Sequence, residues 1–486
     1  MSKDILTLKP EAIWRSFYEL TQIPRPSKKE EKVRAYLKKF GEDLGLETIV
    51  DEIGNVIIKK PATEGMEDRK GIILQGHMDM VPQKNSDTAH DFEKDPIDAY
   101  IDGDWVTARG TTLGADNGMG VAAAMAVLED KTLVHGPVEA LITMDEETGM
   151  TGAENLKAGV IDGDILVNLD SEDEGELYIG CAGGIDTTGE FTYTEEDVPE
   201  GMVAYKITVK GLKGGHSGLD INLGRGNANK IMNALLLKAG EKYGVRLAEI
   251  DGGSLRNAIP RESFAVAVVS EANKADFEQF VDEFDEIVKD EYKDADSNVV
   301  VVVEETEMPA KLIDEKTQAN LYNAVANCPN GVIKMSESVK GITETSTNLA
   351  IVKSENGKIE LASLQRSLID DDKDNLGAEI RKVFEAAGAK AESSGSYPGW
   401  KPNPDSDILK EMKEVYNKRF GKVPEVKVIH AGLECGILGA TYPKWDMISF
   451  GPTIRNPHSP DEMVNIETVQ LFWDFLVETL KNAPKK

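Results

Sequence analysis

Cysteine is scarce in this chain of 486 residues, and the three present, Cys181, Cys328 and Cys435, lie far apart. An odd number of widely spaced cysteines forms neither a disulfide framework nor a zinc–thiolate motif. No apolar run reaches the roughly 20 residues of a membrane-spanning helix. The first residues mix charged and apolar side chains, without the apolar stretch of a signal peptide. We therefore expect a cytoplasmic protein with no membrane partner.

Positive charge is also scarce, since 55 Lys and Arg residues stand against 86 Asp and Glu residues, for a net charge of −31. Nucleic acids and anionic membrane surfaces bind basic patches, so we expect neither as a partner. The excess of carboxylates is compatible with cation-binding sites. A chain of this length exceeds what one hydrophobic core usually supports, which predicts at least two domains.

Three short apolar runs are typical of buried strands, and polar residues follow each of them. Residues 72–74 precede His77 and Asp79, residues 138–144 precede Glu146 and Glu147, and residues 165–169 precede Asp170. Helical patterns between these runs, such as residues 117–128, predict right-handed crossovers and a largely parallel sheet. The carboxyl ends of the strands in such a sheet are where ligands bind.

The middle of the chain has a different pattern. The first series of elements is a strand at 203–210, a helix at 227–239, strands at 245–250 and 262–269, a helix at 275–290 and a strand at 298–304. The second series is a helix at 315–327, strands at 345–352 and 358–365, a helix at 373–387 and a strand at 389–394. The first series is a β-α-β-β-α-β unit, and the second resembles one that lacks its first strand.

These patterns predict an α/β protein in which one domain is inserted into another. Residues 1–184 and 400–486 would form one domain around a mostly parallel sheet. Residues 185–399 would form an inserted α+β domain made of two related halves.

Seven polar residues are candidates for one site: His77, Asp79, Asp116, Glu146, Glu147, Asp170 and His458. Two imidazoles and several carboxylates without a thiolate suit Zn²⁺, and also Mn²⁺ or Co²⁺. Each signal is weak alone, because an isolated His-x-Asp is usually accidental and a Glu-Glu pair usually lies in a solvated turn. The repetition at successive strand ends favours a metal site. We interpret the acidic run 172–176 as a solvated face only.

Two divalent ions roughly 3.5–4 Å apart need a bridging anion between them. One allocation places His77 and Asp170 on the first ion, Glu147 and His458 on the second, and Asp116 between them. Three carboxylates against two divalent ions leave one positive charge. A bridging hydroxide would balance that charge and would also be the nucleophile.

Two carboxylates remain for other roles. Asp79 would hold the second ring nitrogen of His77 and so make it a better ligand. Glu146 would take a proton from the attacking water and deliver it to the leaving amine.

Seven motifs are spread along the chain: GHMDMVP, RGTTLGADNG, MDEETGMTGA, NLDSEDEGE, GGHSG, HAGLECG and NPHSPDE. Together they resemble the motifs of the aminoacyl-histidine dipeptidases, which belong to the dizinc metallopeptidases together with carboxypeptidase-like and aminoacylase-like enzymes. The resemblance covers nearly the whole chain and implies the same ligands and helpers as the allocation above. It also implies that residues 1–184 and 400–486 are a catalytic domain and that residues 185–399 are a lid domain. A homodimer formed through the lid domains and, often, a cis peptide bond after Asp116 are implied as well.

The same resemblance implies roles for residues outside the metal site. His216 would stabilise the oxyanion, although a histidine beside glycines is by itself more typical of a turn. Arg366 and Asn257 would hold the C-terminal carboxylate of the substrate, which suits the planar guanidinium. By its sequence context alone, Arg366 is equally well explained as a surface arginine on a strand. His430 and Glu434 would line the pocket.

We therefore expect a dizinc dipeptidase that hydrolyses Xaa-His dipeptides, including β-alanyl-histidine, with a metal-bound hydroxide and Glu146 as general base and acid. One alternative is a deacylase of N-acyl amino acids. Another is a non-catalytic protein that binds ligands through the metals, but such a protein has no need of the free carboxylate of Glu146.

Overall fold

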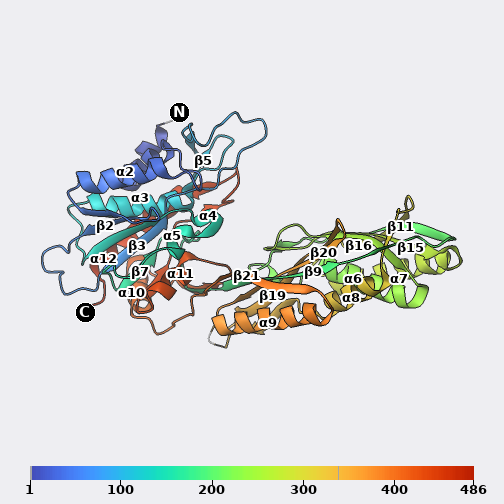
Figure 1. Ribbon diagram of the computed structural model, residues 1–486. Coiled ribbons are helices and arrows are strands. Elements are labelled where there is room, and N and C mark those ends of the chain that lie inside the picture. Colours follow the sequence, from blue (N-terminus) through green and yellow to red (C-terminus); the bar gives the residue numbers. More distant parts are fainter. Residues whose placement is uncertain (1–2, 338) are drawn as a thin grey trace. The chain divides into compact units, whose positions relative to one another are not determined.

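The computed structural model describes residues 3–337 and 339–486, and its chain divides into two compact units (Figure 1). The first unit comprises Met1–Gly180, Trp400–Val428 and Leu433–Lys486. The second comprises Cys181–Gly399 and the short segment Ile429–Gly432. The assignment of the two units as catalytic and lid domains stays a prediction at this point.

An eight-stranded sheet forms the centre of the first unit, in the order β1-β2-β6-β3-β7-β23-β8-β22. The four central strands, β6 (Val138–Thr143), β3 (Ile72–His77), β7 (Ile165–Asn168) and β23 (Asp446–Ser449), run parallel. The outer strands are β1 (Glu47–Val50), β2 (Val56–Lys60), β8 (Glu176–Cys181) and β22 (Glu425–Ile429). Strand β1 pairs antiparallel with β2, β2 with β6, and β8 with β23, so the sheet is mixed, with a parallel centre.

Helices cover both faces of this sheet. Helices α2 (Glu31–Asp43) and α3 (Ala115–Glu129) lie on one face, and α5 (Thr151–Glu154) and α11 (Glu434–Thr441) on the other (Figure 1). Helix α3 packs on β3 and on α1 (Glu11–Thr21). Its alanines, Ala122, Ala123, Ala124 and Ala126, are buried, and their small side chains let the helix lie close to its neighbours. The remaining helices are α4 (Glu146–Gly149), α10 (Asp407–Phe420) and α12 (Ile466–Lys481).

A smaller sheet in the first unit has the order β24-β25-β5-β4. Its strands are β4 (Ala99–Asp102), β5 (Trp105–Ala108), β24 (Ile454–Arg455) and β25 (Met463–Asn465). Strands β24 and β25 pair antiparallel, so residues 456–462 form the loop of a hairpin. This hairpin loop carries His458.

The second unit is built on a larger sheet with the order β16-β11-β15-β13-β19-β20-β9-β21, to which β18 adds by pairing with β19. The strands are β9 (Gly183–Thr192), β11 (Met202–Lys210), β13 (Arg246–Gly252), β15 (Ser263–Ser270), β16 (Val300–Glu305), β18 (Gly331–Met335), β19 (Thr343–Glu355), β20 (Lys358–Ser367) and β21 (Lys390–Tyr397). Four helices, α6 (Ala228–Tyr243), α7 (Lys274–Tyr292), α8 (Glu315–Asn327) and α9 (Asp370–Ala386), lie along one face (Figure 1). Their apolar sides meet that face in a single core, with Leu235, Phe277, Leu321 and Phe384 buried.

The prediction that the second half of this unit lacks its first strand is wrong. The first half has the strand order β16-β11-β15-β13, and the second repeats it in mirror order as β21-β9-β20-β19. Strand β9 therefore occupies the place of β11, although it precedes the whole first half in the chain. The two halves join where β13 pairs with β19. The element was missed because its partners β20 and β21 are far away in the sequence.

Candidate metal centre

The carboxyl ends of three adjacent parallel strands deliver polar side chains to one edge of the central sheet. His77 is the last residue of β3, Glu146 and Glu147 follow β6, and Asp170 follows β7. Asp116 lies at the start of α3, and its peptide bond to Asn117 is cis, as the resemblance implies. The structure thus brings together residues from four separate stretches of the first unit.

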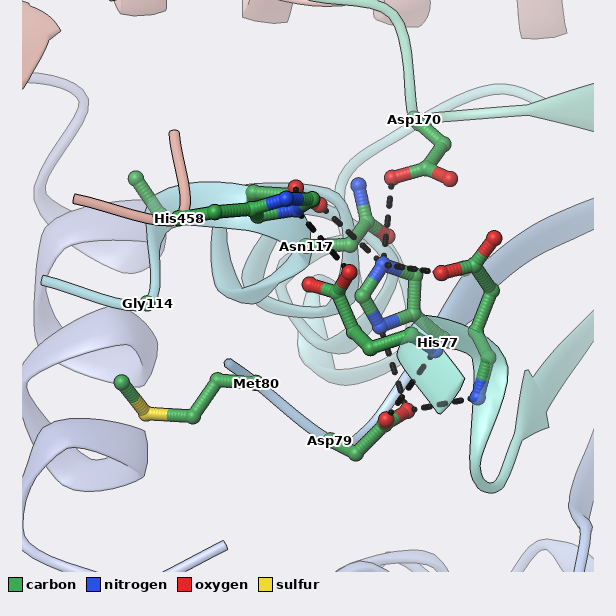
Figure 2. A network of polar contacts seen from close by, with 12 residues as sticks. His77, Asp79, Met80, Gly114, Asn117, Asp170 and His458 are labelled. Atoms are coloured by element: carbon green, nitrogen blue, oxygen red, sulfur yellow. Dashed lines mark hydrogen bonds and ion pairs between the residues drawn. The ribbon is translucent and has the colours of Figure 1, made fainter. Parts of the chain in front are cut away.

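The ring of His77 lies between carboxylates on both sides (Figure 2). Its Nε2 is 3.1 Å from Asp116 Oδ1 and 3.4 Å from Asp170 Oδ1. Ligand atoms of these three residues lie within 4.8 Å of one another, which is a spacing that one metal ion could span.

Asp116 presents its other oxygen to a second group. His458 Nε2 is 3.1 Å from Asp116 Oδ2 and 2.9 Å from Glu147 Oε2. These three residues also have ligand atoms within 4.8 Å of one another. One carboxylate is therefore shared by two ligand groups, each with one imidazole and one further carboxylate, which is the arrangement that a pair of bridged ions requires.

Asp79 contacts both the histidine and the segment after β6. Its Oδ1 is 3.3 Å from His77 Nδ1 and accepts a hydrogen bond of 3.0 Å from the backbone N–H of Glu146. Its Oδ2 accepts one of 3.3 Å from the backbone N–H of Glu147. A fully buried carboxylate thus orients His77 and positions the two glutamates.

Glu146 lies at the rim of the first group, with Oε2 3.9 Å from His77 Nε2. Burial, together with the charges of nearby carboxylates, raises the pKa of Glu146 well above its ordinary value. A carboxyl group with a raised pKa near a metal site is suited to accept and then return a proton.

The electrostatics of the cluster fit a cation. Burial raises the pKa of Asp170 to about 6, and hydrogen bonds to Asp116 and Glu147 raise that of His458 to about 11. Burial alone would raise the pKa of Asp116, but the two histidines outweigh it and the pKa is lowered. Glu147 Oε1 is buried without a hydrogen-bond partner among the described residues, and Asp170 Oδ1 has only the contact of 3.4 Å with His77 Nε2. Crowded carboxylates with unused oxygens are the donor set expected for divalent metal ions.

Several supporting residues were not singled out from the sequence. Glu462 accepts hydrogen bonds from four consecutive backbone N–H groups in the loop that carries Asp116. The buried guanidinium of Arg25 donates to the carbonyls of Met78, Asp79 and Gly114. Glu462 belongs to the NPHSPDE motif, so its position near His458 was a signal that could have been followed. Arg25 had no such signal.

Asn117 joins the Asp116 loop to the strand end that carries Asp170. Its side-chain amide donates to the carbonyl of Leu169 at 2.7 Å. Its Oδ1 lies against two glycines, since a Cβ would come within 2.2 Å of it at Gly76 and within 2.6 Å at Gly120. Both glycines therefore leave the room that Asn117 occupies.

The interpretation of residues 172–176 as a merely solvated face is wrong. Burial and the charges of Asp116 and Asp170 raise the pKa of Glu172 to about 8, which places its carboxyl group in the field of the cluster. Glu174 accepts a hydrogen bond of 2.5 Å from Tyr416. Acidic composition alone did not reveal these contacts.

Glu434 contacts side chains of β3 and β6, two of the strands that lead into the cluster. Its Oε2 accepts hydrogen bonds from the side chains of Gln75 at 2.6 Å and Thr143 at 2.8 Å. Its Oε1 is buried without a hydrogen-bond partner. Burial raises the pKa of Glu434 to about 7.

The other predicted site residues, His216, Asn257, Arg366 and His430, belong to the second unit. His216 Nδ1 accepts hydrogen bonds of 3.1 Å from the backbone N–H groups of Gly218 and Leu219. The imidazole is therefore neutral with its proton on Nε2, and burial lowers its pKa to about 4.

Arg366 is buried beside this histidine's loop. Its Nε is 3.4 Å from Ser217 Oγ, and its Nη1 donates to the hydroxyl of Tyr397 at 2.8 Å. His430 Nε2 is 2.7 Å from Ser346 Oγ, and burial followed by the charge of Arg366 lowers its pKa to about 3. Asn257 is exposed, and its backbone carbonyl accepts from Ser217 N–H.

A sequence model of peptidase family M20/M25/M40 matches residues 73–482. The chain belongs to this family. The resemblance noted in the sequence is thereby confirmed, as are the α/β fold class and the prediction of a peptide-bond hydrolase. The match spans the segments that carry His77 and His458, so both ends of the cluster lie within it.

Two relatives cover nearly the whole chain. The cytosol non-specific dipeptidase of Escherichia coli (strain K12) is 46% identical over 484 residues, which are 99% of this chain and 100% of that protein. The crystal structure of aminoacylhistidine dipeptidase from Vibrio alginolyticus has a TM-score of 0.92 and 49% identity, with 99% of this chain and 98% of that chain covered.

A more distant structure shares the fold alone. Aminopeptidase PepT from Bacillus cereus ATCC 10987 has a TM-score of 0.61 and 19% identity, with 98% of this chain and 99% of that chain covered. Among the described residues of this chain, no helix is both long and apolar enough to span a membrane.

Proposed function

We propose that this protein is a metal-dependent dipeptidase that hydrolyses dipeptides of the Xaa-His type, β-alanyl-histidine among them. The observation that carries the proposal is the pair of ligand groups that share Asp116, with the carboxyl group of Glu146 beside them, 3.9 Å from His77 Nε2. The names of the two full-length relatives, a non-specific dipeptidase and an aminoacylhistidine dipeptidase, support the substrate class.

The first group, His77 and Asp170, would hold one divalent ion, and the second, Glu147 and His458, would hold the other, with Asp116 as the bridge. The donor set of nitrogen and oxygen atoms favours Zn²⁺, with Co²⁺ or Mn²⁺ as substitutes. Bound ions of this kind polarise a carbonyl group and lower the pKa of water to near neutrality.

Glu146 moves the proton in this mechanism. Its carboxylate takes a proton from the water that attacks the scissile carbonyl, and then delivers that proton to the nitrogen of the leaving amine. Asp79 keeps Glu146 in place through the backbone hydrogen bond at 3.0 Å and keeps the His77 ring turned toward the cluster. The raised pKa of Glu146 favours its uptake of the proton from the water.

The predicted role of His216 is to stabilise the oxyanion that forms during the attack. This role needs an imidazole that donates a hydrogen bond, and both backbone donors to Nδ1 leave the proton on Nε2. A donor of this kind is commonly worth about 2.7–4 kcal/mol of transition-state stabilisation.

Arg366 would bind the C-terminal carboxylate of the dipeptide. Arg366 is 5% exposed, and Tyr397 and Ser217 hold its guanidinium by hydrogen bonds, so the orientation of the guanidinium is set before a ligand binds. A planar guanidinium matches a carboxylate with two parallel hydrogen bonds. Asn257 and His430 would complete this part of the pocket.

Glu434 would recognise the free α-amino group of the substrate. Its Oε1 is a buried acceptor with no partner among the described residues, and a substrate ammonium group would satisfy it. This assignment separates the proposed dipeptidase from the alternative, a deacylase of N-acyl amino acids, because an acylated nitrogen carries no charge. We further propose a homodimer formed through the second unit and a cytoplasmic location, the latter in line with the name of the Escherichia coli relative.

The test is a panel of dipeptides, including Xaa-His and β-alanyl-histidine, assayed with and without a chelator. We expect hydrolysis that the chelator abolishes and that added Zn²⁺, Co²⁺ or Mn²⁺ restores. Acetylation of the substrate's amino group should abolish turnover. The proposal is refuted if no member of the panel is hydrolysed in a chelator-sensitive way, and the deacylase alternative is favoured if the acetylated substrates are hydrolysed faster.

The mechanism has its own test in the substitution Glu146→Gln. The variant should bind metal as the wild type does and lose about 10²–10⁴-fold in kcat, the usual contribution of a general base. Glu154→Gln on α5 is the control, since it is the same chemical change at an exposed glutamate on the next short helix. Unchanged turnover in Glu146→Gln would exclude the proton-transfer role.

A further inference from the structure

We infer that Glu462 is a positioning residue that joins the His458 hairpin loop to the Asp116 loop and so assembles the metal site shared by Asp116, Glu147 and His458. The inference rests on the proposed two-metal function. Glu462 is not a member of either ligand group; it acts through the backbone of the residues that form them.

The carboxylate of Glu462 is saturated by backbone donors. Oε2 accepts from the N–H groups of Leu113 at 2.7 Å and Gly114 at 2.9 Å, and Oε1 accepts from those of Ala115 at 2.8 Å and Asp116 at 3.1 Å. The side chain is 2% exposed. These donors belong to the first turn of α3 and the residues before it, where N–H groups lack partners within the helix. A buried anion therefore fixes the backbone of the bridging aspartate.

Arg25 secures the same loop from the other side. Its Nη2 donates to the Gly114 carbonyl at 2.5 Å, and its Nη1 donates to the carbonyls of Met78 and Asp79. Gly114 has a φ of 71°, and a Cβ there would lie 2.6 Å from Nη2 and 2.8 Å from the sulfur of Met80. Figure 2 shows Met80 and Gly114 beside the network of His77 and Asp79. The Gly114 peptide is thus held through its N–H by Glu462 and through its carbonyl by Arg25.

The position of Glu462 in the chain explains why this contact bears on the metal. Glu462 is the last residue of the hairpin loop 456–462, directly before β25, and His458 is in the same loop. His458 has a φ of 59° and a side chain that is 52% exposed, so packing around its own ring holds it weakly. Glu462 anchors that loop to the residues that precede Asp116, which keeps His458 Nε2 near Asp116 Oδ2.

Replacement by glutamine tests the charge and the acceptor count with little change of shape. The amide of Glu462→Gln keeps one oxygen for two of the four N–H groups, while its NH₂ faces the other two donors. Loss of such a supporting contact typically weakens metal binding by about 10–100-fold. We expect the lower affinity at the ion held by Glu147 and His458, because His77 and Asp170 keep their positions at the strand ends.

The experiment is a Co²⁺ titration of metal-free full-length protein, followed by visible absorption and by calorimetry. The wild type should bind two equivalents, whereas Glu462→Gln should bind one with wild-type affinity and one about 10–100-fold more weakly. Glu462→Asp keeps the charge on a shorter side chain and should lower the affinity for the same ion by a smaller factor. This variant preserves the test if the glutamine variant does not fold.

Glu139→Gln is the matched control. Glu139 is 5% exposed and accepts backbone hydrogen bonds from Asp162 at 3.0 Å and Gly163 at 2.6 Å, at the opposite end of β6 from Glu146. Its replacement should lower the melting temperature and leave two Co²⁺ equivalents at wild-type affinity. Two wild-type sites in Glu462→Gln, or equal metal loss in Glu139→Gln, would overturn the inference. A wild type that binds fewer than two ions would overturn the two-metal function itself.

Discussion

The substitution Asp79→Asn probes how the cluster is oriented. Asp79 uses both oxygens, Oδ1 toward His77 Nδ1 and the Glu146 N–H, and Oδ2 toward the Glu147 N–H. An asparagine has one acceptor, so its NH₂ group must face either the Glu147 N–H or the His77 side. In the second case the imidazole could keep its hydrogen bond only with the proton on Nε2, the nitrogen that faces the metal site.

The size of the effect follows from these contacts. Leaving one buried donor unsatisfied costs about 1–3 kcal/mol, and 1.4 kcal/mol corresponds to about a tenfold change in an equilibrium constant. We therefore expect metal affinity to fall by about 10–100-fold, the range seen for residues that orient metal ligands. Activity should recover in part at high metal concentration, because the ligands themselves remain.

The assay is competition for Zn²⁺ against a coloured chelator, with kcat and KM measured at saturating metal. Asp296→Asn is a matched control, since Asp296 is also fully buried and accepts backbone hydrogen bonds of 2.7 Å on each oxygen, from Lys213 and Gly226 in the second unit. That variant should lose stability and keep its metal affinity. Wild-type metal affinity in Asp79→Asn would refute the orienting role.

Three further changes are informative. Arg366→Lys removes the planar fork that Tyr397 holds at 2.8 Å, so KM for dipeptides should rise more than kcat falls, and steady-state kinetics would contradict the carboxylate role if KM stayed constant. Burial lowers the pKa of His430 from 6.5 to about 3, so the unfolded chain binds the proton first as the pH falls and stability is lost below pH 6.5. The loss in the free energy of unfolding should reach roughly 2 kcal/mol at pH 5. Urea melts of His430→Gln should show a smaller decrease in stability between pH 6.5 and pH 5 than melts of the wild type. An equal decrease in the two proteins would show that His430 is solvated in the folded state. Gly76→Ala would place a Cβ 2.2 Å from Asn117 Oδ1, so activity should fall sharply in dipeptide assays, and wild-type turnover would mean that this packing is dispensable.

The periodicity of the sequence predicted most of the helices and longer strands of the second unit, because those elements are long and amphipathic. Helix α8 (Glu315–Asn327) has the predicted bounds, and β11 (Met202–Lys210) differs by one residue. Strand β9 was missed because its run GGIDTTGEFT is rich in glycine and threonine and pairs with strands far along the chain. The hydrophobic pattern of one segment indicates which of its residues are buried, but it does not indicate which other segment pairs with it.

The sequence by itself determined the chemistry of the candidate site. Imidazole and carboxylate side chains directly after apolar strands indicated a metal centre, since parallel strands that end at one edge of a sheet bring such residues together. The motif NPHSPDE pointed to His458 as the remaining imidazole, although nothing local distinguishes it from a surface histidine.

The tertiary structure decided which of these residues touch. His77 and His458 meet opposite oxygens of Asp116 because the hairpin loop, the start of α3 and the end of β3 are held together by Glu462 and Arg25. Arg25 and Glu462 bind backbone groups, and because every residue has these groups, the sequence does not indicate which of them will be bound. The spacing of the ligands therefore depends on contacts between distant segments, which only the folded chain establishes.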